Sequence, residues 1–208
     1  MASFETKLVY SIHSGSGEHA AIAEITQPLI MEYAERCGAD YRVAIVGGLE
    51  EAVEAKYELA WLLGTYDRIL YVDNDVVISP GAPSIFDAVI GHGLAALNEA
   101  RYFEGRLSHV QATHQVNLTR YFNGGVMLLG QHCHEMFAKV PPIEMHPAWY
   151  EQCYLNIAAR DIGFTDLGPM WNYMTTMPDP GKTPYFRHAA GKRGKERLEL
   201  IKSWTKTP

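Results

Sequence analysis

The segment Arg68-Ile69-Leu70-Tyr71-Val72-Asp73-Asn74-Asp75 decides the fold of this 208-residue chain. Its continuous apolar run predicts a central strand that is covered on both faces, as the strands of parallel sheets are. Two aspartates follow the run two positions apart, so in extended backbone both carboxylates point to the same side. Ligands of open parallel sheets bind at the carboxyl ends of the strands. Asp73 and Asp75 therefore indicate a site for one hard cation, the alternative being turn aspartates that bond to their own backbone.

Strands and helices alternate on both sides of this segment. Apolar periodicity predicts strands at Lys7–His13, Tyr41–Val46, 93–97 and 125–129, and helices at 18–37, 49–63, 83–90, 131–139 and 150–160. This order is typical of right-handed βαβ units, which build a Rossmann-like, mostly parallel central sheet flanked by helices. We expect one α/β domain spanning 1–208, in which Pro28 either kinks the first helix or opens its second half. The segment from Asn98 to Asn123 matches no period and is expected to be irregular.

Charge is distributed unevenly along the chain. The formal net charge of −6 argues against a general nucleic-acid binder. From Lys182 onward, eight Lys or Arg residues stand against two Glu, so the segment 182–208 is basic. Such a segment is either a solvated end or a clamp for a small anion.

Composition narrows the class of protein further. No apolar stretch approaches the roughly 20 residues that cross a bilayer, and the start, MASFETKLVY, has neither the basic nor the apolar region of a signal peptide. Three widely spaced cysteines form no CxxC pair, which indicates neither a disulfide framework nor a structural zinc site. We therefore expect a cytoplasmic protein without an integral membrane segment.

Five motifs, in order along the chain, resemble those of one enzyme family. They are Lys-Tyr-Glu-Leu-Ala to Val-Asp-Asn-Asp at 56–75, Phe-Asn-Gly-Gly-Val-Met at 122–127, Glu-Gln-x-x-Leu-Asn at 151–156, Trp-Asn-Tyr at 171–173, and His-Ala-Ala-Gly at 188–191 with Lys192 and Lys195 behind it. The chain thereby resembles the GT-A fold glycosyltransferases, and within them glycosyltransferase family 8, the group of glycogenin and the bacterial lipopolysaccharide galactosyltransferases. The resemblance covers about Lys56 to Lys195.

The resemblance implies a metal-dependent transfer of a sugar from a nucleotide-diphosphate sugar, with UDP favoured, to a hydroxyl of a carbohydrate or glycan acceptor. By resemblance, Asp73, Asp75 and His188 hold Mn²⁺ against the donor diphosphate, with Mg²⁺ also suited to the carboxylates. Donor contacts are implied for Ser11, Lys56, Asn74, Asn123, Gly124, Gly191, Lys192 and Lys195. Gly194 stands where the family has its diphosphate-binding lysine, so Lys192 or Lys195 is expected to replace that residue, and the basic segment 182–208 to close over the diphosphate.

Glu151 and Gln152 match the family element beside the reacting carbon, where Glu151 replaces the usual aspartate. The resemblance implies retention of anomeric configuration, with Gln152 or Glu151 lining the oxocarbenium-like centre. An inverting reaction with Glu151 as general base fits the same carboxylate. Two other functions stay open: a sugar nucleotidyltransferase, although the first loop lacks its basic glycine-rich signature, and a non-catalytic module that binds a nucleotide sugar or carbohydrate.

Overall fold

A six-stranded sheet forms the centre of the computed structural model, which describes residues 5–138 and 150–206. Its strands, in the spatial order β2-β1-β3-β6-β5-β7, are β2 (Asp40–Val46), β1 (Lys7–Ser14), β3 (Arg68–Asp73), β6 (Phe122–Gly130), β5 (Ala95–Asn98) and β7 (Thr165–Asp166). β1 is parallel to β2 and β3, and β5 is parallel to β7. β6 runs antiparallel to both of its neighbours. The predicted mostly parallel α/β sheet is confirmed, with β6 as the reversed strand.

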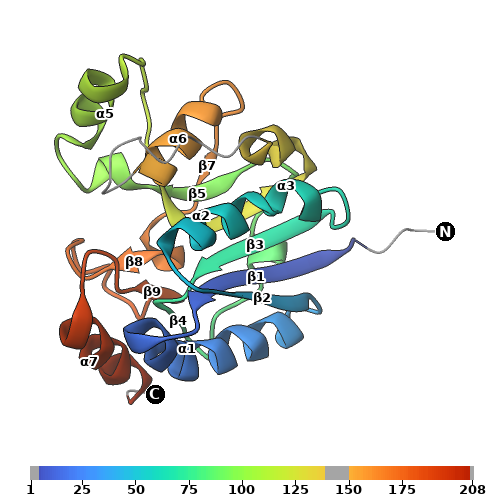
Figure 1. Cartoon of the computed structure of the whole chain (residues 1–208), viewed down its shortest axis with the longest axis vertical. Helices are drawn as coiled ribbons and strands as arrows, with labels where there is room; N and C mark the ends of the chain where they lie inside the picture. The colour runs from blue at the N-terminus through green and yellow to red at the C-terminus, as the bar shows by residue number, and fades with distance from the viewer. Residues whose placement is uncertain (1–4, 139–149, 207–208) are drawn as a thin grey trace.

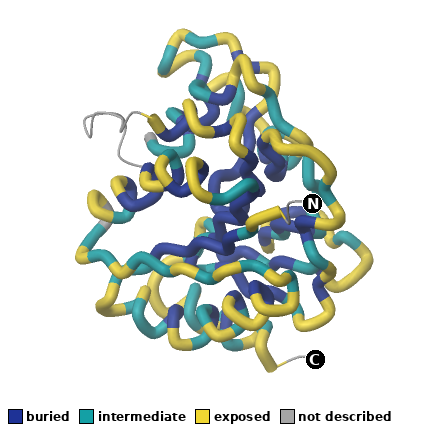
Figure 2. Tube along the Cα trace, turned by 90° about the vertical axis from the view of Figure 1, so that its right-hand side faces the viewer, coloured by how far each residue is buried: buried dark blue, intermediate teal, exposed yellow. Residues whose placement is uncertain are grey.

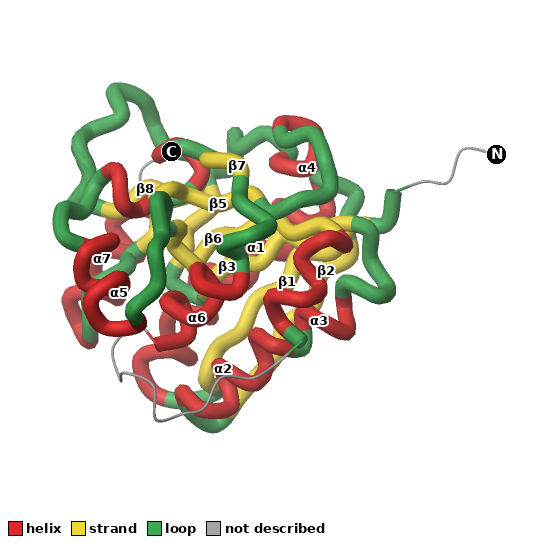
Figure 3. Tube along the Cα trace, turned by 90° about the horizontal axis from the view of Figure 1, so that it is seen from above, coloured by secondary structure: helices red, strands yellow, loops and turns green. Residues whose placement is uncertain are grey.

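Helices cover both faces of this sheet (Figure 1). One face packs on α2 (Leu49–Tyr57), α3 (Leu59–Leu62), α6 (Tyr150–Ala158) and the 3₁₀ segment η2 (Gln131–Phe137), and the other on α1 (Gly17–Arg36) and α4 (Ile85–Ala88). β3 contributes to the hydrophobic core on each face of the sheet. Ile69 and Tyr71 pack on the first face, and Leu70 and Val72 pack on the second. Alternate residues of a strand point to opposite faces, which explains why the whole run is apolar. Figure 2 shows the buried chain running through the middle, and Figure 3 shows the strands among the surrounding helices.

A second, three-stranded sheet brings distant parts of the chain to the end of β3. It consists of β4 (Val76–Ile78), β9 (Phe186–His188) and β8 (Tyr173–Met174), in the order β4-β9-β8. β4 and β9 are antiparallel, with Val76 opposite His188. The residues just before β4 and the end of β9 therefore lie side by side, although more than a hundred positions separate them in sequence.

The basic segment that begins at Lys182 contributes β9 and the helix α7 (Gly194–Thr205). α7 packs against α1 through a small apolar cluster that includes Ile22 and Ile201, with Leu198 and Trp204 partly buried beside them. Figure 1 shows the two helices as neighbours at the lower left of the molecule.

Several predicted elements differ from those in the structure. The helix predicted at 49–63 is divided at Glu58, where the backbone N–H bonds to Ala55, three residues back instead of four. The helix predicted at 131–139 is the 3₁₀ segment η2, whose buried Cys133 and Met136 have the three-residue spacing of that helix type. Residue 139 lies outside the described residues.

The expectation of irregular structure between Asn98 and Asn123 is wrong in part. This segment holds the 3₁₀ turn η1 (Glu99–Arg101) and the helix α5 (Arg106–His114). Within α5 only Val110 is buried, so the sequence shows no apolar stripe from which a helix could be predicted.

Two further features complete the description. α1 continues across Pro28, and the short 3₁₀ turn η3 (Pro169–Trp171) precedes β8. Within the described residues, no helix is both long enough and apolar enough to cross a membrane.

Candidate functional site

Asp73 and Asp75 lie where β3 ends and the chain turns into β4. Each of their carboxylates and the His188 imidazole offers one ligand atom, and these three atoms lie within 4.8 Å of one another. His188 Nε2 is 3.2 Å from Asp75 Oδ1 and 3.8 Å from Asp73 Oδ2. The pairing of β4 with β9 produces this arrangement, since His188 faces Val76 and the N–H of Ala189 donates to the carbonyl of Asp75. The structure thus brings the three predicted metal ligands together.

The electrostatics of this cluster favour positive charge between its members. Burial raises the pKa of Asp75, but the attraction of His188 and Arg197 outweighs burial and leaves this pKa below its usual value. Burial lowers the pKa of His188, but the attraction of Asp75 and Asp73 outweighs it and leaves the pKa above its usual value. Asp75 thus retains negative charge for a cation, and His188 has to lose one proton before its Nε2 can bind that cation.

Gly125 gives the cluster its space. A Cβ atom at this position would lie 2.2 Å from His188 Cε1 and 2.7 Å from Asp73 Oδ2, which are impossible contacts. Two carboxylate oxygens and one imidazole nitrogen suit a divalent cation, and the imidazole favours Mn²⁺ over Mg²⁺. The donor set and the space left by Gly125 therefore fit the metal that the fold family implies, and Asp73, Asp75 and His188 could hold it.

Lys56 connects the cluster to the other side of the site. Its ammonium is 2.6 Å from Glu151 Oε1 and 3.6 Å from Asp73 Oδ1, and it lies over the Tyr71 ring. Burial lowers the pKa of Lys56, but the attraction of Asp73 and Glu151 outweighs burial and raises the pKa above its usual value. Lys56 therefore carries a fixed positive charge between Asp73 and Glu151.

A network of amides holds the two residues predicted beside the donor sugar and the reacting carbon, Asn123 and Gln152. The Gln152 side chain accepts from the Gly124 N–H at 3.1 Å and donates to Glu99 Oε2 at 2.8 Å. Asn123 Nδ2 donates to the same Glu99 oxygen at 3.2 Å. Glu99 is buried, and Arg106 binds its other oxygen at 2.6 Å. Glu99 thus orients both amides.

Asn74 and Ser11, two residues predicted to contact the donor, are hydrogen-bonded to residues of α1. Asn74 Nδ2 donates to the carbonyl of His19, and its Oδ1 accepts from Gln27. Ser11 is fully buried, and its hydroxyl oxygen accepts from the same Gln27 amide at 3.2 Å. Asn74 still lines the cavity described below, whereas Ser11 is absent from its wall. Their roles in donor binding stay predictions.

The basic residues near α7 differ in where they lie. Lys192 lines the cavity but binds Glu196 at 2.6 Å, and Lys195 is exposed and lies outside the cavity wall. Arg197 lines the cavity, and its Nε is 3.6 Å from Asp75 Oδ2. Gly191 also lines it, with a positive φ of 77° that a residue with a side chain rarely adopts.

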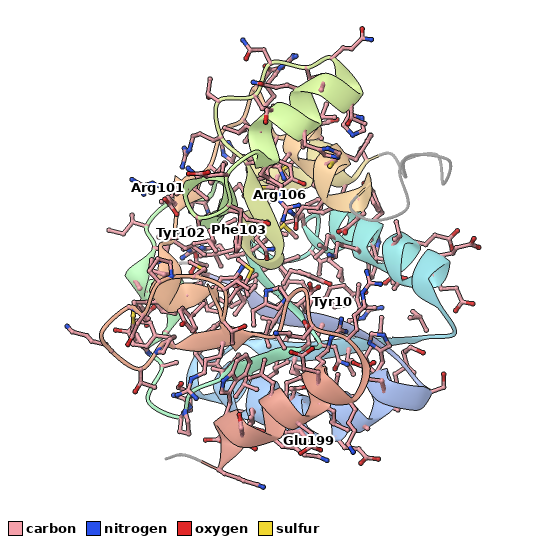
Figure 4. The ribbon with its side chains drawn as sticks, turned by 90° about the vertical axis from the view of Figure 1, so that its left-hand side faces the viewer. Tyr10, Arg101, Tyr102, Phe103, Arg106 and Glu199 are labelled. Atoms are coloured by element: carbon pink, nitrogen blue, oxygen red, sulfur yellow. The ribbon has the colours of Figure 1, made fainter. Side chains whose placement is uncertain are left out.

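A cavity of about 770 Å³ joins these groups. Its wall includes the three candidate metal ligands, and also His13, Lys56, Phe103, Arg106, Gln152 and Arg197. Figure 4 shows Phe103 and Arg106 toward the middle of the molecule and Arg101 at its left edge. The cavity is large enough for a small-molecule ligand.

Among the residues of this site that sequence reasoning missed are Gly125, Asn172, Arg197 and Glu99. Gly125 and Asn172 lie inside motifs quoted above. A single sequence shows neither that position 125 has no room for a side chain nor that the buried Asn172 amide contacts His188. Arg197 lies three positions after Gly194, one helical turn beyond the expected lysine, and this spacing could have identified it. Glu99 follows a short strand and carries no recognisable signal.

No family model matches the chain, and no curated protein matches its sequence. Solved structures do share its fold. The chain is similar to a glycosyltransferase involved in the glycosylation of the major capsid of PBCV-1, with 18% identity and a TM-score of 0.69 over 95% of this chain and 99% of that one. It is similar to an active-site mutant of LgtC, with 15% identity and a TM-score of 0.63 over 96% of each chain.

A third similar structure is the apo form of the glycosyltransferase GlyE of Streptococcus pneumoniae, with 14% identity and a TM-score of 0.57 over 98% of this chain and 64% of that one. Identities this low establish the fold alone. The fold is that of the GT-A glycosyltransferases, as the motif resemblance implied.

Proposed function

We propose that the chain is a metal-dependent glycosyltransferase that moves a sugar from a nucleotide-diphosphate sugar, with UDP favoured, to a hydroxyl of a carbohydrate acceptor. One observation carries this proposal: Asp73, Asp75 and His188 meet in the wall of a large cavity on a fold shared with glycosyltransferases. A divalent cation held by these side chains, Mn²⁺ by preference, would act as a Lewis acid that stabilises the negative charge of the leaving diphosphate.

The side chains around the cluster divide the remaining tasks. The fixed charge of Lys56 offsets part of the negative charge of Asp73 and Glu151, which weakens the repulsion of a negatively charged donor from that side. Asn123 and Gln152 are held by Glu99 in one orientation, which preorganises them to bind the donor sugar without a cost for ordering the amides.

The contacts of Glu151 favour a retaining reaction within this proposal. A general base needs a free carboxylate oxygen directed at the acceptor hydroxyl. Glu151 Oε1 is 2.6 Å from the Lys56 ammonium, so only Oε2 is left for that role. Gln152 then remains the residue to line the reacting carbon while the diphosphate leaves on the side where the acceptor arrives. The anomeric configuration of the product separates this reaction from an inverting one.

The diphosphate requires a cation in place of the family's lysine, and we assign this role to Arg197. Arg197 lines the cavity beside Asp75, and a hydrogen bond of 2.7 Å from its Nε to the Lys192 carbonyl fixes its position. Lys195 is exposed and outside the cavity wall, and the Lys192 ammonium binds Glu196. Arginine also presents a fork of donors that matches phosphate oxygens.

Replacing Arg197 is therefore expected to weaken nucleotide binding more than replacing Lys195. Loss of a hydrogen bond to a charged group costs about 1.5–3 kcal/mol, so Arg197→Met is expected to raise the dissociation constant of a nucleoside diphosphate with Mn²⁺ by roughly 10- to 100-fold. Lys195→Met is the matched control and is expected to change this constant by less than about twofold. Titration calorimetry measures both. The opposite ranking would return the role to Lys195.

Thermal unfolding of the wild-type chain with nucleotide sugars, with and without Mn²⁺, tests the function as a whole. A donor at 100 times its dissociation constant adds about 2.7 kcal/mol of stability, which raises the midpoint of a domain this size by roughly 5–10 °C. Stabilisation only with metal, followed by release of the nucleoside diphosphate on adding acceptor, supports the proposal. Metal-dependent binding without any hydrolysis or transfer would instead identify a non-catalytic module.

A further inference from the structure

A chain of buried hydrogen bonds leads from the donor-sugar side of the cavity to the candidate metal ligand His188. Its members are Glu99, Asn123, Asn172 and His188, all of them buried. Asn172 lies between η3 and β8 and is fully inaccessible to solvent. Each hydrogen bond needs a donor on one side and an acceptor on the other. One backbone donor that joins these side chains therefore determines, bond by bond, which of their atoms donate and which accept.

That donor is the N–H of Gly125, which can only donate. It lies 3.0 Å from Asn123 Oδ1, so this atom is the amide oxygen. The assignment is supported at the other end of the same amide, where Asn123 Nδ2 donates to the carboxylate of Glu99. A carboxylate that is ionised can only accept, so both partners require the same orientation of Asn123.

The orientation of Asn172 follows from that of Asn123. The Asn172 atom that lies 2.9 Å from Asn123 Oδ1 must be a donor, so it is Nδ2. The remaining atom, Oδ1, lies 2.9 Å from Nδ1 of His188 and can only accept. The proton of this last bond therefore belongs to His188 Nδ1.

We propose that Asn172 is a positioning residue that keeps the proton of His188 on Nδ1 and so directs the lone pair of Nε2 at Asp73 and Asp75. Nε2 is the ring atom 3.2 Å from Asp75 and 3.8 Å from Asp73. A lone pair facing two carboxylates is unfavourable unless a cation lies between them. The arrangement therefore prepares the ring to accept a metal ion, and the inference rests on the metal site of the proposed function.

The state of the ring can be measured without any catalysis. In protein labelled with ¹⁵N at histidine, the nitrogen chemical shifts show which ring atom carries the proton when the ring holds only one, and the His188 signals are assigned by their absence from His188→Gln. The neutral ring is expected to carry its proton on Nδ1. A neutral ring protonated on Nε2 in the wild-type chain overturns the proposal, and no variant of Asn172 has to fold for this measurement.

Two variants at position 172 separate positioning from packing. Asn172→Leu removes the acceptor and is expected to weaken Mn²⁺ binding by about 10- to 100-fold, as loss of a partner behind a metal ligand typically does. It is also expected to leave a mixture of the two ring tautomers. Asn172→Asp keeps an acceptor for Nδ1–H and is expected to restore the Nδ1 proton. An Asn172→Leu chain with unchanged tautomer and unchanged Mn²⁺ affinity contradicts the proposal.

Tyr33→Phe is the matched control for loss of a buried polar contact. Tyr33 is fully buried, and its hydroxyl bonds to Pro83 and Ile85 on the other side of the sheet from α2. This variant is expected to unfold at lower temperature while Mn²⁺ affinity and the His188 tautomer stay unchanged. If the wild-type chain binds no metal but His188 still carries its proton on Nδ1, the proposed metal function fails while the inference on Asn172 stands.

Discussion

Asp75→Asn is expected to abolish Mn²⁺-dependent nucleotide binding and to lower sugar transfer by roughly a thousandfold. The substitution keeps the size of the side chain but removes one of the two negative charges that face His188. Metal stabilisation of a leaving group amounts to several kcal/mol, and each 1.36 kcal/mol of activation free energy is a factor of ten in rate. Rates with and without Mn²⁺, together with calorimetric binding of the nucleotide, measure the effect.

The fold of this variant is expected to persist with a modest loss of stability. Asp75 forms ion pairs with His188 and Arg197, and weakening contacts to charged groups costs about 1.5–3 kcal/mol. Asp161→Asn is a suitable control because Asp161 is exposed and pairs only with its neighbour Arg160 among the contacts described. An Asp75→Asn enzyme that keeps a tenth or more of its metal-dependent rate is incompatible with the proposed function.

Gly125→Ala is expected to weaken metal binding to a similar extent, by a steric clash instead of the loss of a charge. The new methyl group would stand 2.2 Å from one atom of the His188 ring and 2.7 Å from an oxygen of Asp73. The ring cannot simply move aside, because it is buried and bonded to Asn172. We expect Mn²⁺ affinity to fall by at least about 100-fold and the free energy of unfolding to fall by roughly 1–3 kcal/mol, as for other overpacked cores.

The neighbouring glycine provides the control. A Cβ atom at Gly124 would come no closer than 3.8 Å to Gln152, which is an ordinary contact. Gly124→Ala is therefore expected to keep the metal affinity and the unfolding midpoint of the wild-type chain. Equal metal affinities in the two alanine variants would show that Gly125 does not shape the metal site.

The sequence predicted the parts of the fold that depend on local pattern. The apolar run of β3 needs two covered faces, and the alternation of strands and helices predicts a largely parallel sheet. The direction of β6 could not be predicted, because a strand buried on both faces has the same apolar pattern in either direction. α5 was missed because one buried side chain, Val110, produces no helical stripe.

The candidate site was predictable where chemistry requires a particular residue type. Asp73, Asp75 and His188 were identified as ligands from the resemblance, and the structure places them together. Arg197 and Glu99 were not identified, because their roles depend on which face of a turn or helix points into the cavity. Gly125 acts by lacking a side chain, and such a requirement becomes visible only when the neighbouring atoms have positions.

The docking of α7 on α1 has a consequence for how the protein is made. Arg197 reaches the cavity only when α7 lies against the apolar cluster of Ile22 and Ile201. During synthesis the first helix leaves the ribosome long before the residues that cover it. A nascent or shortened polypeptide that ends before Gly194 would therefore expose part of this cluster and lack the cationic side chain that Arg197 adds to the cavity wall.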